Sequence, residues 1–138
     1  MEKSKKPWKF FSWNTLCIIM VSCLLNAVIW VAFHGIPLMG FPEKEDIQSI
    51  TIHCNGIEER KITEEQDIAL LVNAVNLLNY QLWGKAEGNP IIGITYHLEN
   101  GNDINIEANG TTIWWHGKSH ALKQPDVFVN IIEGLFFN

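Results

Sequence analysis

The sequence predicts an α+β fold, in which an N-terminal transmembrane helix is followed by a two-layer domain. Three observations support this class. An apolar run of about twenty uncharged residues precedes the domain, several later segments alternate apolar with polar residues, and two others place apolar residues at helical spacing. We expect an antiparallel sheet of about five strands with two helices on one face, in the order β-β-α-β-β-β-α. The predicted parts are a basic cytoplasmic tail at 1–12, the transmembrane helix at 13–33, a linker at 34–46 and the domain at 47–138.

The apolar run from Trp13 to Phe33 has the length of a membrane span. A helix of that length rises ~31 Å at ~1.5 Å per residue, which matches the hydrocarbon thickness of a bilayer. Four lysines and one glutamate precede the run, whereas the flank after it is mixed to acidic. The positive-inside rule therefore predicts a single-pass protein of the cell membrane, with its N-terminus in the cytoplasm and its C-terminal domain outside.

Two other readings of the apolar run stay open. A basic start and an apolar run also fit a cleaved signal peptide, although the run is long and no small-x-small site follows it. The segment Met20–Cys23 resembles an imperfect lipobox with Cys23 as the lipidated residue, but the sequence continues apolar for ten residues beyond it. Asn26, a polar residue deep in the run, is either tolerated on a single helix or directed to a neighbouring one.

The part of the chain after the predicted transmembrane helix is acidic, with fourteen Asp and Glu against six Lys and Arg. A domain with this excess of negative charge lacks the basic surface that nucleic-acid binding requires, so we expect no nucleic-acid partner. The excess also predicts repulsion from anionic lipid, which suits a domain held off the membrane by a linker. Cys54 is the only cysteine of the domain. Its place in an alternating segment predicts a buried small hydrophobe, while an intermolecular disulfide is the alternative.

The first half of the domain contains two predicted strands and the main core helix. Residues 47–54 alternate so that Ile50, Ile52 and Cys54 share a face, and a turn at Asn55-Gly56 leads to a charged edge strand at 57–62. Thr63 and Gln66 suggest a capping box at the start of a helix over 64–82. Its apolar stripe consists of Ile68, Leu71, Val75, Leu78 and Leu82.

The second half reads as three meandering strands and a closing helix. The strands are expected at 91–98, 103–108 and 111–116, after a loop at 84–90. A three-residue loop at 100–102 with a bulge would pair Leu98 with Ile104, and a type I′ turn at Asn109-Gly110 would pair Ile106 with Ile113. A loop at 119–124 then leads to a helix that starts near Pro125 and packs beside the first.

The solvent-exposed face of the sheet gathers the residues that suggest chemistry. Trp114 is an unusual residue for an open sheet face, so we expect it to anchor a partner; the predicted partner-binding set is Trp114, His116, Asn105 and Thr112. An alternative is a zinc or copper site, because imidazole suits both metals; its predicted ligands are His53, His97, His116 and Glu107. No short ligand spacing supports the metal site, and no motif for another cofactor is present.

Neither catalysis nor glycosylation has a strong signal. Ser119 and His120 are adjacent and an acid such as Glu133 is in the chain, but adjacent residues do not define a triad and no nucleophile-elbow sequence occurs. Asn109-Gly110-Thr111 matches a glycosylation sequon that the predicted hairpin explains without sugar. We therefore expect a protein that is not an enzyme.

The lysine-rich start, the single anchor and a module of about ninety residues together resemble small uncharacterised membrane-anchored or lipoprotein domains of Gram-positive bacteria. The segments that carry the resemblance are ITEEQDIALLVNAVNLL, ITYHLENGNDINIEANG and HGKSHALKQPDVFVNIIEGLF. The resemblance implies an extracytoplasmic module and transfers no catalytic residue. The expected function is a noncatalytic binding or regulatory module that recognises a protein or peptide through the open sheet face.

Overall fold

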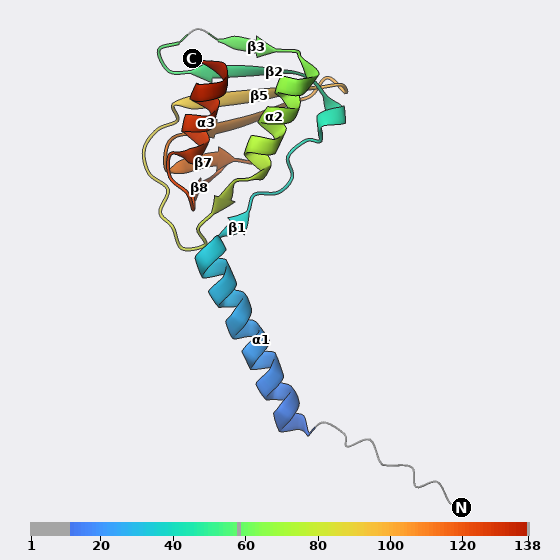
Figure 1. Ribbon diagram of the computed structural model, residues 1–138, viewed down its shortest axis with the longest axis vertical. Coiled ribbons are helices and arrows are strands. Elements are labelled where there is room, and N and C mark those ends of the chain that lie inside the picture. The colour runs from blue at the N-terminus through green and yellow to red at the C-terminus, as the bar shows by residue number, and fades with distance from the viewer. Residues whose placement is uncertain (1–11, 58, 138) are drawn as a thin grey trace, which may run out of the picture. The chain divides into compact units, whose positions relative to one another are not determined.

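A computed structural model describes residues 12–57 and 59–137 of the chain. The chain divides into two compact units, residues 1–33 and residues 34–138. Residues 1–11 of the predicted cytoplasmic tail lie outside the described part. The α+β class is confirmed: an apolar helix is followed by a domain of antiparallel strands and helices (Figure 1).

Helix α1 (Trp13–His34) forms where the apolar run predicts it. Ser12 caps its start, because the Ser12 hydroxyl accepts a hydrogen bond from the Thr15 backbone N–H at 3.3 Å. The Asn26 amide donates to the Ser22 carbonyl of its own helix at 2.8 Å, which satisfies the one polar group that looked out of place. By length and composition, α1 is long and apolar enough to cross a membrane.

Within the described residues, the main sheet has six strands in the order β3-β2-β5-β6-β7-β8, and each neighbouring pair is antiparallel. The connection from β3 to β5 passes through α2 and places β5 on the other side of β2. The strands are β2 (Ile47–Cys54), β3 (Arg60–Ile62), β5 (Ile92–Leu98), β6 (Asp103–Ala108), β7 (Thr112–Trp115) and β8 (Lys118–Ala121). The charged second strand is thus shorter than predicted, and its expected range includes Glu58, which is outside the described residues.

The predicted linker at 34–46 is instead part of the domain. Strand β1 (Ile36–Pro37) pairs with β4 (Asn79–Tyr80) in a small second sheet, and a short 3-10 helix, η1 (Lys44–Asp46), leads into β2. The Trp115 indole donates to the Met39 carbonyl at 3.1 Å, and Phe41 packs on the Trp115 ring at a centroid distance of 4.6 Å. The glycines and prolines that suggested a linker therefore mark turns in a packed segment.

Helix α2 (Glu65–Asn76) is shorter at both ends than predicted. Glu64, and not Thr63, is the N-cap residue, and no side-chain capping bond forms. The helix ends at Asn76 because the following residues pair with other strands: β4 meets β1, and the Gln81 N–H donates to the Ala121 carbonyl at 2.8 Å. Leu82 is consequently exposed and does not belong to the core stripe.

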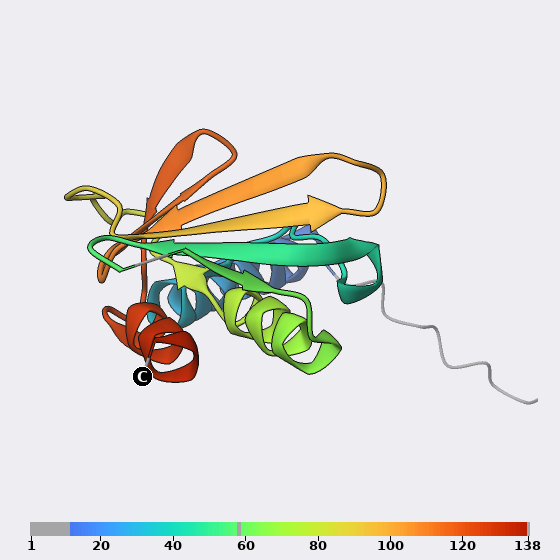
Figure 2. The same cartoon turned by 90° about the horizontal axis from the view of Figure 1, so that it is seen from above.

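Helices α2 and α3 (Val127–Phe136) lie on the same face of the main sheet, as predicted (Figure 2). Between them and the sheet is the core, to which the strands contribute alternate residues such as Ile50, Ile52, Ile94 and Ile106. Cys54 is buried in this core with a free thiol, as predicted, and burial raises the pKa of that thiol. Neither α2 nor α3 covers the opposite face of the main sheet (Figure 2).

The predicted strand registers are each wrong by two residues. The β5–β6 loop consists of Glu99, Asn100 and Gly101, so Tyr96, and not Leu98, pairs with Ile104. Ala108 pairs with Ile113 across the β6–β7 connection, in place of Ile106. A shift of two residues keeps every side chain on its predicted face, because side chains alternate with a period of two. The predicted burial pattern therefore survives the error in register, except at Thr112, which is buried.

The type I′ turn occurs at a different place from the one predicted. His116 and Gly117 both have positive φ, at 50° and 70°, and they join β7 directly to β8, whereas Asn109 and Gly110 do not form such a turn. Strand β8 was predicted as a loop because its sequence, Lys118 to Ala121, has little β propensity. The tight turn and its pairing with β7 determine its conformation instead.

Candidate functional site

The open face of the main sheet carries a row of residues that crosses five strands at one level. Register pairs align His53 of β2 with Gly93 of β5, Gly93 with Glu107 of β6, Glu107 with Trp114 of β7, and Trp114 with Ser119 of β8. Cross-strand neighbours of this kind interact directly through their side chains. The row therefore places an imidazole, a carboxylate and an indole side by side on a continuous surface.

Gly93 leaves a hollow in this row, because it has no side chain between His53 and Glu107. The hollow has a volume of about 320 Å³ and is lined by His53, Asn55, Pro90, Ile91, Ile92, Gly93 and Glu107. The lining comes from β2, β5 and β6 and from the residues next to them, Asn55 after β2 and Pro90 and Ile91 before β5. We refer to it as the Gly93 hollow.

The polar groups at the hollow are accessible. The His53 side chain is 54% exposed, and its Nδ1 lies 3.8 Å from Glu59 Oε1, a pair that is ionic only when the imidazole is protonated. Glu107 is exposed and its register neighbour Trp114 is half-buried, so a carboxylate and an aromatic surface adjoin at one edge. A carboxylate beside an indole suits a cationic group, through an ion pair and a cation–π contact.

A second polar row lies further along the same face. The Thr51 hydroxyl is 2.9 Å from His97 Nε2, and His97 Nδ1 is 2.8 Å from Asp103 Oδ1. These distances match a nucleophile, base and acid in series. Thr51 lies in β2 between Lys61 of β3 and Thr95 of β5, where the sheet ladder engages the backbone N–H groups. These N–H groups are therefore not available as the oxyanion donors that acyl transfer needs. The row therefore orders the surface, together with the Thr95 hydroxyl, which donates to Asn105 Oδ1 at 2.8 Å.

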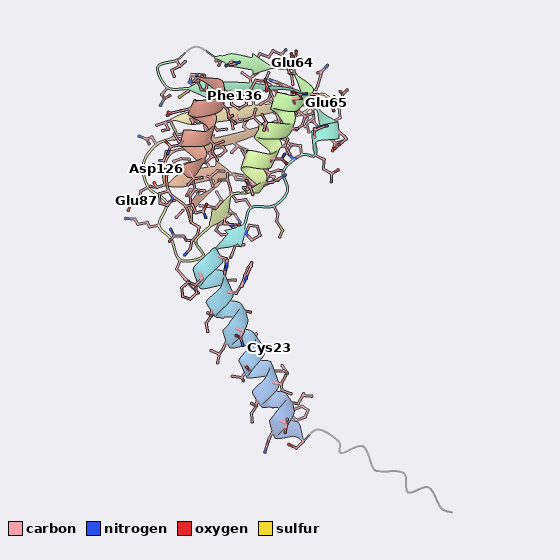
Figure 3. The ribbon with its side chains drawn as sticks, in the orientation of Figure 1. Cys23, Glu64, Glu65, Glu87, Asp126 and Phe136 are labelled. Carbon is pink, nitrogen blue, oxygen red and sulfur yellow. The ribbon has the colours of Figure 1, made fainter. Side chains whose placement is uncertain are left out.

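The predicted partner-binding residues divide between open and covered positions. Trp114 and Asn105 lie on the open face, as expected. Thr112 is fully buried, because its hydroxyl accepts from the Glu87 N–H at 2.9 Å and donates to the Glu87 carbonyl at 3.0 Å. Glu87, labelled in Figure 3, belongs to the loop at 84–90 that covers this position. Thr112 is thus a structural residue and not part of the open surface.

The four predicted metal ligands do not come together. His53 and Glu107 flank the Gly93 hollow, and His97 is engaged by Thr51 and Asp103. His116 is on the β7–β8 turn, where its ring lies 4.0 Å from the Trp115 ring, a core residue. Among residues 12–57 and 59–137, no group of three or more His, Cys, Asp and Glu side chains is placed to hold a metal.

Ser119 and His120 point to opposite faces of β8, because consecutive strand residues alternate. Ser119 pairs with Trp114 on the open side, whereas the His120 ring lies 4.6 Å from the Tyr80 ring. Burial, and next the charge of Lys118, lowers the pKa of His120. The pair therefore forms no acid–base unit.

Gly93 was not among the predicted site residues, although its place in the sequence carries a signal. A glycine inside the strand segment IIGITYHL weakens the strand, and such a glycine often marks a place where a ligand or another backbone approaches closely. The role of Gly93 depends on its cross-strand neighbours, His53 and Glu107. These neighbours are identified only by the register across β2, β5 and β6.

Comparisons with known proteins provide no further assignment. No family model, no curated protein and no solved structure matches this chain.

Proposed function

We propose that this protein is a membrane-anchored, noncatalytic binding module that recognises a protein or peptide through the open face of its sheet. The observation that carries the proposal is the Gly93 hollow, bounded by His53 and Glu107 and adjoined by Trp114. An edge of carboxylate and indole, beside a space for a side chain, favours a basic side chain of the partner. The acidic balance of the domain would attract such a partner over a longer range.

The preformed order of the face supports binding rather than turnover. The contacts of Thr51 with His97 and of His97 with Asp103 fix three side chains before any partner arrives, which lowers the entropy cost of association. A flat surface with one shallow hollow suits the recognition of an extended segment, whereas catalysis needs convergent acid, base and oxyanion groups.

The proposed location is the cell membrane, with α1 as a single-pass anchor and the domain outside. The length and composition of α1 support the span, and the four lysines before it support a cytoplasmic N-terminus. The test is protease treatment of intact cells that express the full chain with tags at both ends. Loss of the C-terminal tag alone is the expected result, and loss of the N-terminal tag alone would contradict the orientation.

The binding test uses the full chain in its native membrane, with a photo-crosslinking residue in place of the exposed Asn105. Crosslinked partners are identified by mass spectrometry, and the same residue in place of Leu70 serves as a control. Leu70 is 46% exposed on α2, on the opposite face of the sheet. Capture from position 105 and not from position 70 is expected, whereas equal capture from both positions, or none from position 105, would contradict the proposed surface.

Filling the hollow tests its role without disturbing the fold. A Cβ at Gly93 would meet only the His53 Cβ, at 3.9 Å, and valine favours strands, so Gly93→Val should keep or raise the stability of the domain. We expect Gly93→Val to abolish capture from position 105. Thr95→Val, on the same strand and face but outside the residues that line the hollow, should retain it. Undiminished capture by a folded Gly93→Val variant would overturn the assignment of the site.

A further inference from the structure

Four large apolar side chains are exposed around the small β1–β4 sheet. The exposed fractions are 73% for Met39, 74% for Leu77, 51% for Leu82 and 73% for Trp83. Leu77 is two residues before β4, Leu82–Trp83 begin two residues after it, and Met39 is two residues after β1, with which β4 pairs. We call these four residues the base patch. Exposed apolar groups that gather in this way mark a surface that contacts something other than water.

The chain connects the base patch tightly to α1. Only two residues, His34 and Gly35, separate Phe33 from Ile36, the first residue of β1, and the three steps along the chain span at most ~11 Å. This limit holds for any angle between the helix and the domain. If α1 crosses a bilayer, the β1–β4 pair is therefore held within about a headgroup layer of its surface.

The charges of the domain are separated along it. None of its fourteen carboxylates falls in the three segments that meet at β4, which are residues 34–42, 68–86 and 111–125. These contain Lys85, Lys118 and Lys123, and Lys85 Nζ lies 3.7 Å from the carboxylate of Glu87, just outside them. Acidic residues are instead concentrated in η1 and at the start of α2, where Figure 3 labels Glu64 and Glu65. The twelve residues of α2 put ~18 Å between that end and Leu77.

We propose that the base patch lies in the headgroup layer of the membrane that α1 crosses and fixes the orientation of the domain on it. The inference rests on the proposed membrane anchoring. Tryptophan and leucine beside lysine make up the composition that favours the boundary between headgroups and acyl chains, and the scarcity of carboxylates in the three segments reduces the repulsion that the net charge would otherwise cause. The domain then contacts the bilayer surface directly and is not held away from it by a linker.

The test places a nitroxide at the patch and compares its surroundings with those of a distant label. The full chain, with Cys17 and Cys23 replaced by alanine and the buried Cys54 retained, is reconstituted into vesicles of phosphatidylcholine and phosphatidylglycerol. A nitroxide is attached at Leu77→Cys, or at Asn100→Cys in the β5–β6 loop as the control. The loop is next to η1, because the Glu99 N–H donates to the Asp46 carbonyl at 2.9 Å. Accessibility to oxygen and to a water-soluble nickel complex is measured by electron paramagnetic resonance.

We expect the label at position 77 to be accessible to oxygen and protected from nickel, and the label at position 100 to show the reverse. Adding Leu82→Ser and Trp83→Ser should abolish the protection at position 77 while the Tm of the domain stays unchanged. If the protein floats with the vesicles but both labels are equally accessible to nickel, the contact of the base patch with the membrane is wrong and the anchoring by α1 still holds. If the protein does not float, the anchoring by α1 is wrong, and the proposed contact of the base patch is wrong with it.

Discussion

At the scale of single residues, the Asn109 side chain makes hydrogen bonds with both its amide nitrogen and its amide oxygen. Its amide nitrogen donates to the Glu87 carbonyl at 2.9 Å and to the Asn89 carbonyl at 3.1 Å. Its amide oxygen accepts from the backbone N–H groups of Thr111 and Thr112 at 2.8 and 2.7 Å. One side chain therefore ties the loop at 84–90 to the β6–β7 connection, and the sequon match has a structural cause.

Replacing Asn109 by aspartate tests this role with almost no change in size. The second carboxylate oxygen would face two carbonyl oxygens, so we expect Asn109→Asp to lower the free energy of unfolding by about 3 kcal/mol. Asn100→Asp is the matched control, because Asn100 uses only its oxygen, which accepts from the Asn102 N–H at 3.0 Å. The control should change stability by less than about 0.5 kcal/mol in urea unfolding of the full chain in micelles. Equal losses in both variants would contradict the role of the Asn109 donors.

Tyr96 is a buried residue whose hydroxyl has no partner within the described residues. Burial raises the pKa of this phenol, so the group stays neutral at all physiological pH values. Because an unpaired buried hydroxyl costs free energy, Tyr96→Phe should raise the free energy of unfolding by about 1 kcal/mol. The same urea experiment measures it. A destabilised Tyr96→Phe variant would mean that the hydroxyl is paired in the folded protein.

At the scale of elements, the connection into β1 depends on Gly35. This glycine has a φ of +78°, and a Cβ on it would lie 2.7 Å from the Tyr80 backbone oxygen of β4. Gly56 in the β2–β3 turn has a similar φ of +82°, but a Cβ there would meet nothing within 4 Å. Comparing the two positions therefore separates the free-energy cost of a positive φ, which both share, from the cost of the clash with the Tyr80 oxygen, which only Gly35 would have.

We expect Gly56→Ala to lower the free energy of unfolding by about 1 kcal/mol, which is the cost of a left-handed alanine. Gly35→Ala should cost about 2–4 kcal/mol, because the clash is with backbone that cannot turn away. Thermal and urea unfolding of the full chain in micelles measure both. Similar losses in the two variants would show that the β1–β4 pair moves apart to admit the methyl group.

Local patterns predicted the elements better than the connections between them. Alternation identified β2, β5 and β6 within one residue, because burial on one face fixes which residues are apolar. The end of α2 was missed because Leu78 and Leu82 continue the helical spacing, whereas pairing with β1 sets the actual end at Asn76. The strand β8 depends on the turn at His116 and Gly117, and histidine with positive φ has no clear sequence signal.

The candidate site was predictable only in part for the same reason. Trp114 and Glu107 were assigned to the open face from their strand phase, but their neighbours follow from a register that the turns determine. Nothing local in the sequence indicates that the loop at 84–90 buries Thr112, or that His53 and Glu107 face each other across Gly93. Contacts between distant segments, and not propensity, create the hollow.

At the scale of the whole molecule, we expect His120 to make the stability of the domain depend on pH. Its ring packs against Tyr80, so it links β8 of the main sheet to β4 of the small one. Burial, and to a lesser degree the charge of Lys118, lowers its pKa in the folded state below the ordinary 6.5. Between the folded pKa and 6.5 the unfolded chain therefore binds more protons than the folded one.

The free energy of unfolding should consequently include a contribution from His120 that is fully present above pH 6.5 and is lost as the pH falls towards the folded pKa. His120→Phe keeps a ring against Tyr80 and does not titrate, so we expect it to remove this loss. Lys118→Gln leaves the burial of His120 unchanged, so it should remove only the smaller part of the stability loss, the part due to the charge of Lys118. The measurement is urea unfolding of the three full-length proteins in micelles between pH 5 and pH 8. If His120→Phe loses as much stability as the wild type on acidification, the pH dependence originates in other groups. If Lys118→Gln removes the whole loss, charge outweighs burial at this site.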